Sequence, residues 1–120
     1  MSYLREYNTG RALLTIDGDY IKDYMSGRIK YRINGDMLVD YTSGRNLYNL
    51  GGGYIKDYTS GRYVLNVVGN QVKDYISGRI LATYDDTYVK DYTSGRISYK
   101  IDGFTSQREK MALIAILFVI

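Results

Sequence analysis

A motif that returns every 17 residues constrains this chain more than any other feature. Six glycines stand 17 residues apart, an arginine follows each, a tyrosine lies three residues before each, and an acidic residue precedes each tyrosine. A short fixed period indicates a repeat architecture in which each unit is one supersecondary element. We therefore expect six copies of one unit over residues 3–103, inside a single domain of residues 1–120. The glycines are Gly10, Gly27, Gly44, Gly61, Gly78 and Gly95.

Each unit is expected to be a β-hairpin. It holds two short runs rich in Tyr, Ile and Val, separated by turn residues, which is the pattern of paired strands. Asp17-Gly18 and Asn34-Gly35 predict two-residue type I′ turns, because both central positions of that turn need φ > 0. Met25-Ser26-Gly27 predicts a three-residue loop with the glycine in the left-handed conformation.

These loop lengths predict which residues face each other across the strands, and partners across a strand pair share a face of the sheet. The predicted pairs are Tyr24 with Arg28, Lys22 with Lys30, Tyr20 with Arg32, and Tyr31 with Leu38. One face is then mostly aliphatic and carries Ile21, Asp23, Ile29, Tyr31 and Ile33, whereas the other carries Tyr, Lys and Arg. A one-residue slip would exchange the two faces, so the pattern favours this register.

The apolar C-terminal tail, residues 111–120, explains how twelve such strands could close into a barrel. Met111–Ile120 is apolar without a break, and ten residues are too few to span a bilayer as a helix. Twelve strands about 4.8 Å apart and tilted by about 40° close at a radius of roughly 12 Å. One buried helix would fill that interior, and Ser106 with Glu109 three residues later forms a capping-box pattern.

The predicted fold is therefore all-β with one helix: a closed 12-stranded antiparallel barrel around a hydrophobic C-terminal helix. Residues 104–120 form the linker and the helix that plugs the barrel. A β-trefoil-like fold and an open meandering sheet are the alternatives, although an open sheet would leave two unpaired edges. Two alternatives to the plug remain for the apolar tail: reversible membrane insertion, with Arg108 and Lys110 flanking the tail as an interfacial anchor, and a dimer contact.

One acidic residue per repeat forms the first candidate site. In the predicted register these side chains point inward at the Ser-Gly end and form an acidic ring at one mouth of the barrel. Each carboxylate could accept hydrogen bonds from its own turn, or the ring could bind a cation or a polar ligand. The negative end of the helix would approach the same mouth. The acidic residues are Glu6, Asp23, Asp40, Asp57, Asp74 and Asp91.

An exposed tyrosine and arginine face forms the second candidate site. Cation–π packing across the strands would explain it, and an anionic ligand, a lipid headgroup or single-stranded nucleic acid would be the functional alternative. Nucleic acid is disfavoured because the net charge is only +3 and the basic residues are spread through the repeats. The representative residues are Tyr24, Arg28, Tyr58, Arg62, Tyr92 and Arg96.

Composition argues against catalysis, because the chain has no His and no Cys. The commonest general base and the usual imidazole and thiolate metal ligands are thus missing. Asp17-Gly18-Asp19 lacks the spaced ligands of a calcium loop, and Gly51-Gly52-Gly53 lacks the Lys-Ser/Thr of a phosphate loop. We expect no enzyme, no cofactor, no metal and no transmembrane span. The start of the chain has no apolar signal region, and a cytoplasmic setting, peripheral to a membrane in the lipid-binding alternative, is the expectation.

The sequence of the repeat resembles that of a known family. Tyr20-Ile21-Lys22-Asp23-Tyr24, then Ser26-Gly27-Arg28 and Ile33-Asn34-Gly35-Asp36, are similar to the repeats of the bacterial β-flower proteins. The architecture resembles the tubby C-terminal domain, whose twelve-stranded barrel encloses a hydrophobic helix. The resemblance implies the fold. Tubby domains bind phosphoinositide headgroups through a basic pocket, which this chain does not match residue by residue.

The expected function is a non-enzymatic binding or scaffold module that presents its turns and faces to a protein or a small ligand. Peripheral binding of anionic lipid headgroups is the alternative, by tubby-like analogy. Because symmetry explains most residues structurally, the best places for function are where it breaks. These places are Val39, Asn46, Gly51–Gly53, Asp85-Asp86 and the tail.

Overall fold

The computed structural model describes residues 2–103 and 106–120, and residues 104 and 105 of the predicted linker lie outside the described residues. The strands form one closed antiparallel barrel in which every neighbour is consecutive in sequence and β1 pairs with β12. The twelve strands are β1 (Ser2–Glu6), β2 (Ala12–Asp17), β3 (Tyr20–Asp23), β4 (Ile29–Asn34), β5 (Met37–Asp40), β6 (Asn46–Asn49), β7 (Tyr54–Asp57), β8 (Tyr63–Val68), β9 (Gln71–Asp74), β10 (Ile80–Tyr84), β11 (Tyr88–Asp91) and β12 (Ile97–Asp102).

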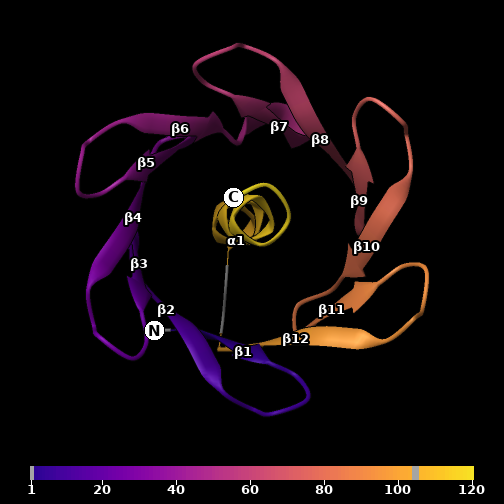
Figure 1. Cartoon of the computed structure of the whole chain (residues 1–120), viewed down its shortest axis with the longest axis horizontal. Helices are drawn as coiled ribbons and strands as arrows, with labels where there is room; N and C mark the ends of the chain where they lie inside the picture. The colour runs from indigo at the N-terminus through magenta and orange to yellow at the C-terminus, as the bar shows by residue number, and fades with distance from the viewer. Residues whose placement is uncertain (1, 104–105) are drawn as a thin grey trace.

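The predicted closed barrel is thus confirmed, and it is broad and short. It measures 36 by 34 by 19 Å along its principal axes. Figure 1 shows six hairpins around a ring, each with its long loop directed away from the centre, and the helix α1 (Gln107–Phe118) at the middle of the ring. Closure leaves the ring without the unpaired strand edges that an open sheet would expose to other chains.

The long loops, which we call the outer loops, differ from the predicted three-residue loops. The amide of Asp23 donates to the carbonyl of Arg28 at 2.8 Å, and the amide of Gly27 donates to the carbonyl of Asp23 at 2.9 Å. The loop therefore holds four residues, Tyr24 to Gly27, closed by an i→i+4 hydrogen bond. Gly27 has φ 73°, a conformation that only glycine adopts without strain. All six repeats make the first of these bonds.

This fourth loop residue shifts part of the predicted register. The pair of Tyr20 with Arg32 is confirmed. The pairs of Lys22 with Lys30 and of Tyr24 with Arg28 are wrong, because a β-bulge after Ile21 places Lys22 opposite Ile29. A bulge lets one strand carry an extra residue and bend. The backbone amides of Asp57 and Asp91 likewise donate to the carbonyls of Arg62 and Arg96. Tyr58 and Tyr92 therefore lie in four-residue loops and do not pair with those arginines.

The short turns also differ from their predicted type. Asp17 pairs with Tyr20 and Asn34 pairs with Met37, so the two loop residues are Gly-Asp and the preceding Asp or Asn ends a strand. Leu38 consequently lies opposite Ile33, and the predicted pair of Leu38 with Tyr31 is wrong. Gly18 has φ 61°, and no described residue other than glycine has positive φ. A two-residue turn with positive φ only at its first central residue, usually glycine, is type II′, whereas type I′ needs positive φ at both central residues.

Both corrections preserve the predicted faces of the sheet. The register moved by two residues at the short turn, and an even shift leaves every side chain on its own face. At the outer loop the β-bulge absorbs the one-residue shift, because Tyr20 still pairs with Arg32 and Ile21 with Tyr31. Ile21, Tyr31 and Ile33 are buried in the barrel, whereas Tyr20, Arg32 and Lys30 are exposed. The inner face of the ring therefore supplies the wall of the hydrophobic core.

The helix α1 supplies the rest of that core. Ser106 is its N-cap, and both hydrogen bonds of the predicted capping box with Glu109 are present. Residues Met111–Ala115 are buried, and residues 116–119 are partly buried against the same cluster. Gln107 and Lys110 anchor the first turn: Gln107 donates to the hydroxyl of Tyr84 at 3.2 Å, and Lys110 pairs with Asp86.

Symmetry breaks at two of the short turns. Between β6 and β7 the chain makes a short 3-10 turn at Gly51–Gly53, where a side chain on Gly53 would approach the carbonyl of Val67 at 3.2 Å. Between β10 and β11, Asp85 accepts hydrogen bonds from the amides of Thr87 and Tyr88. Two of the predicted symmetry breaks therefore have structural roles in closing turns.

Candidate functional site

The acidic residue of each repeat is bound to its own outer loop. The carboxylate oxygen Oδ2 of Asp23 accepts from the amide and the hydroxyl of Ser26, both at 2.8 Å. The hydroxyl oxygen of Ser26 in turn accepts from the amide of Arg28 at 3.2 Å. The first repeat varies the arrangement, with Thr9 donating its hydroxyl to Glu6. The shape that the repeats share thus follows from a short side chain bonding to nearby backbone groups.

These hydrogen bonds favour the ionised form of the loop aspartates. The pKa of Asp23 is lowered, chiefly by the amide of Ser26 and then by its hydroxyl. The pKa values of the equivalent carboxyls are lowered by the corresponding serine, because hydrogen bonds to a carboxylate favour the charged form. The four equivalent residues are Asp40, Asp57, Asp74 and Asp91.

The structure brings four of the six predicted acidic residues together in two pairs, Asp23 with Asp40 and Glu6 with Asp91. Within the described ranges, no three acidic side chains lie close enough to hold a metal ion. Instead, two neighbouring hairpins each contribute one carboxylate to a groove between them. One of these grooves, which we call the first groove, is lined by Asp23, Ser26, Arg28, Ile29, Lys30, Tyr31, Asp40 and Thr42.

A second groove occupies the equivalent place four repeats later. Asp91 and Glu6 take the places of the two carboxylates, Arg96 that of the arginine and Tyr99 that of the tyrosine. The volumes are about 360 Å³ for the first groove and about 300 Å³ for the second. The two hollows thus lie at symmetry-related places in the ring, and the chemistry of each depends on the residues of its own copies.

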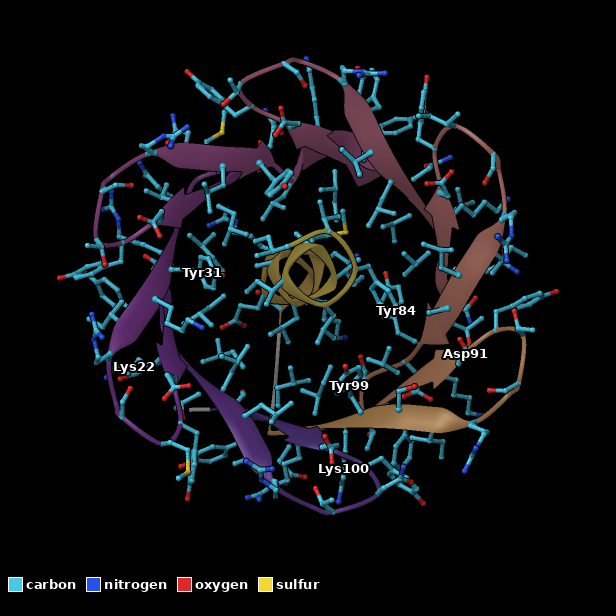
Figure 2. The ribbon with its side chains drawn as sticks, viewed as in Figure 1. Lys22, Tyr31, Tyr84, Asp91, Tyr99 and Lys100 are labelled. Carbon is cyan, nitrogen blue, oxygen red and sulfur yellow. The ribbon has the colours of Figure 1, made fainter. Side chains whose placement is uncertain are left out.

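The inner tyrosines of these grooves were not predicted as site residues. Figure 2 shows Tyr31 and Tyr99 on the inner side of the ring, and Tyr48 occupies the same repeat position between them. The other three copies carry Leu14, Leu65 and Ala82 there. Burial and the charge of Asp40 raise the pKa of Tyr31, and burial with Asp57 and Tyr31 raises that of Tyr48. A position-by-position comparison of the six copies could have identified these tyrosines, because the inner position varies between copies.

The predicted outer tyrosine and arginine face has a different organisation from the one expected. Tyr24 and Arg28 are exposed, but Tyr24 packs edge-on against Tyr3 of the preceding hairpin, with ring centroids 6.0 Å apart. The same contact joins Tyr20 to Tyr41 at 6.0 Å. Edge-to-face contacts of this kind are favourable for aromatic rings. The loop tyrosines therefore connect neighbouring hairpins on the outside of the barrel.

Positive charges above aromatic rings occur at other positions than the predicted ones. In the described part of the chain they are Arg5 above Tyr3 and Lys56 above Tyr63. Arg5 also pairs with Asp102 across the closure of β1 on β12, and this hydrogen bond is the main cause that lowers the pKa of Asp102. These contacts stabilise the closed ring and define no concave site.

Exposed apolar side chains occur at the chain end and at the tips of two outer loops. Ile120 keeps 54% of its surface exposed at the chain end, after the partly buried residues 116–119. Met25 and Ile76, at the tips of two outer loops, are each 81% exposed. No helix in the described ranges combines the length and hydropathy that a membrane span requires.

Comparisons of the chain with protein-family models, with curated proteins and with solved structures return no match. What the chain can bind must therefore be inferred from its own grooves, loops and faces.

Proposed function

We propose that this chain is a non-enzymatic binding module of the bacterial β-flower repeat family, with a tubby-like barrel, acting in the cytoplasm. Two observations support membership of this family. They are the repeat sequence at Tyr20–Tyr24 and Ser26–Arg28 and the closed ring around one helix. In this proposal the barrel is a rigid scaffold, and the grooves between neighbouring hairpins are its binding sites.

The observation that carries the binding role is the pair of equivalent grooves. Ligand sites are concave and place a few polar groups on a largely fixed frame. Here the walls come from paired strands and hydrogen-bonded loops, so the polar groups are preorganised. Catalysis is disfavoured because Ser26 bonds to a carboxylate with no histidine between them, so no nucleophile–base–orienter arrangement arises.

A screen of small polar compounds by amide chemical-shift mapping tests the binding role. We expect at least one compound class to shift amides that line the first groove, such as those of Asp23, Tyr31 and Asp40. Shifts confined to the outside of the barrel, or none for every class, would contradict the proposal. Lys56, on the outer face, serves as the internal reference for non-specific effects.

Peripheral binding to an anionic membrane surface is the second candidate. The exposed tips Met25 and Ile76 favour it, because apolar tips with nearby arginines can insert among lipid headgroups. Co-sedimentation with vesicles at low salt, with and without phosphatidylserine, tests it. This candidate predicts binding to the anionic vesicles and its loss in the variant Met25→Ser with Ile76→Ser. Failure to bind either vesicle would reject it.

A further inference from the structure

A buried tyrosine lines the first groove, and its hydroxyl has no protein partner among the described residues. Tyr31 is only 9% exposed and lines the groove, yet its hydroxyl makes no hydrogen bond within residues 2–103 and 106–120. Buried polar groups are nearly always hydrogen-bonded. The comparison is Tyr84, equally buried, whose hydroxyl donates to the carbonyl of Gly69 and accepts from Gln107. The Tyr31 hydroxyl is therefore left to bond with water in the groove or with a ligand that displaces this water.

Tyr31 offers a proton to that partner at neutral pH. Burial and the negative charge of Asp40 raise the pKa of Tyr31 above its ordinary value, so the phenol stays protonated. A protonated phenol can both donate and accept one hydrogen bond. The ring also gives the groove an apolar surface beside Ile29.

Charge balance in the first groove selects the kind of ligand. Two carboxylates, Asp23 and Asp40, stand with two cations, Arg28 and Lys30, so the formal charges cancel. Each carboxylate uses its Oδ2 atom for the loop serine, and within the described residues its Oδ1 atom accepts no hydrogen bond. An anionic ligand would meet two carboxylates and a cationic ligand two cations, whereas a neutral ligand with several hydroxyl groups could bond to all four groups.

We propose, as an extension of the proposed function, that the first groove binds a neutral polyhydroxylated ligand of the class of a pyranose sugar unit. Sugar hydroxyls donate to the free Oδ1 atoms of Asp23 and Asp40 and accept from the Tyr31 hydroxyl. The guanidinium of Arg28 and the ammonium of Lys30 donate to remaining hydroxyl oxygens. A volume of about 360 Å³ lies at the lower end of the range for small-molecule sites.

The second groove is a natural variant of the same site. Ser98 replaces Lys30 and Glu6 replaces Asp40, so its formal balance is one negative charge, from two carboxylates against Arg96. Both grooves belong to one closed ring, so a polymer whose sugar units span the distance between them would engage both. Linking two weak contacts raises the overall affinity without any new contact.

Titration of the isotopically labelled protein with methyl β-glucoside, methyl β-galactoside and N-acetylglucosamine tests the proposal. We expect millimolar binding of at least one sugar, with amide shifts centred on Asp23, Tyr31 and Asp40. Tyr31→Phe removes only the unpaired hydroxyl, so it should fold normally and weaken this binding about three- to tenfold. Tyr84→Phe, which removes a hydroxyl bonded elsewhere, is the matched control and should leave sugar affinity unchanged.

A second variant keeps the test independent of the tyrosine. Lys30→Ser copies the second groove onto the first at an exposed position, and we expect weaker sugar binding with unchanged melting behaviour. No shift with any of the three sugars, or equal affinity in the wild type and in Tyr31→Phe, would overturn the proposal. Binding of inorganic phosphate or of lysine methyl ester in the groove without sugar binding would also overturn it, yet it would support the proposed binding function.

Discussion

Removing a buried side chain from α1 tests whether the helix completes the core. Leu113 is 2% exposed and belongs to the central apolar cluster. Leu113→Ala removes three carbon atoms' worth of buried surface and leaves a cavity, because the paired strands of a closed ring cannot collapse around it. The expected cost is about 3–4 kcal/mol of the free energy of unfolding.

That cost translates into a measurable melting shift. Unfolding entropy is about 2.1 cal/mol/K per residue, or roughly 0.25 kcal/mol/K for a chain of 120 residues. The melting temperature of Leu113→Ala should therefore fall by about 12–16 °C, read by circular dichroism at the strand signal. Ile120→Ala, in the same tail but 54% exposed, is the control and should change the free energy by less than about 0.5 kcal/mol.

Equal melting temperatures for the two variants would refute the buried helix. The same result would be expected if the tail left the barrel for a membrane or for a second copy, because Leu113 would then contribute nothing to the folded monomer. Deletion of residues 111–120 gives the extreme case and should abolish cooperative unfolding.

Three further predictions concern the repeat surface. Gly27→Ala should cost about 1–2 kcal/mol in urea unfolding, because its φ of 73° is strained for a side chain, and Gly27→Asn should cost less; an unchanged midpoint for the alanine variant would contradict this. The pKa of Asp23 is lowered in the folded state, so its contribution to stability is present above the ordinary value of 3.8 and is lost as pH falls through the folded pKa; Ser26→Ala should flatten this acid dependence of the melting temperature. A double-mutant cycle on Tyr20 and Tyr41 should give a coupling of about 0.5–1.5 kcal/mol, and a coupling of zero would exclude a stabilising contact between the hairpins.

The sequence was sufficient for the architecture because the two faces of the sheet depend only on whether positions are odd or even. Ile21 and Ile33 therefore identify the inner face even though the length of the outer loop and the position of the short turn were misjudged. The length of the outer loop depends on the hydrogen bond from Gly27 to Asp23. That bond is set by backbone angles, which residue types constrain only weakly.

The candidate site was predictable only in part. The link between an acidic residue and its own loop serine is local in sequence and could be foreseen. The groove between Asp23 and Asp40 could not, because it depends on how far adjacent hairpins diverge at their outer loops. Likewise, the bond between Gln107 and Tyr84 depends on the rotation of α1 inside the ring, and no periodic pattern encodes that rotation.

The single helix at the centre has a consequence for how this chain can vary. One helix cannot present the same surface in six directions, so six identical hairpins cannot all pack equally well against it. The outer loops can remain copies of one another, and each keeps its tyrosine, glycine and arginine. The inner position must diversify, and it does so as Leu14, Tyr31, Tyr48, Leu65, Ala82 and Tyr99. Duplication of one hairpin could therefore produce the ring, but packing around the helix requires different residues at the inner positions. New binding groups could arise at these positions, because they already differ between the copies.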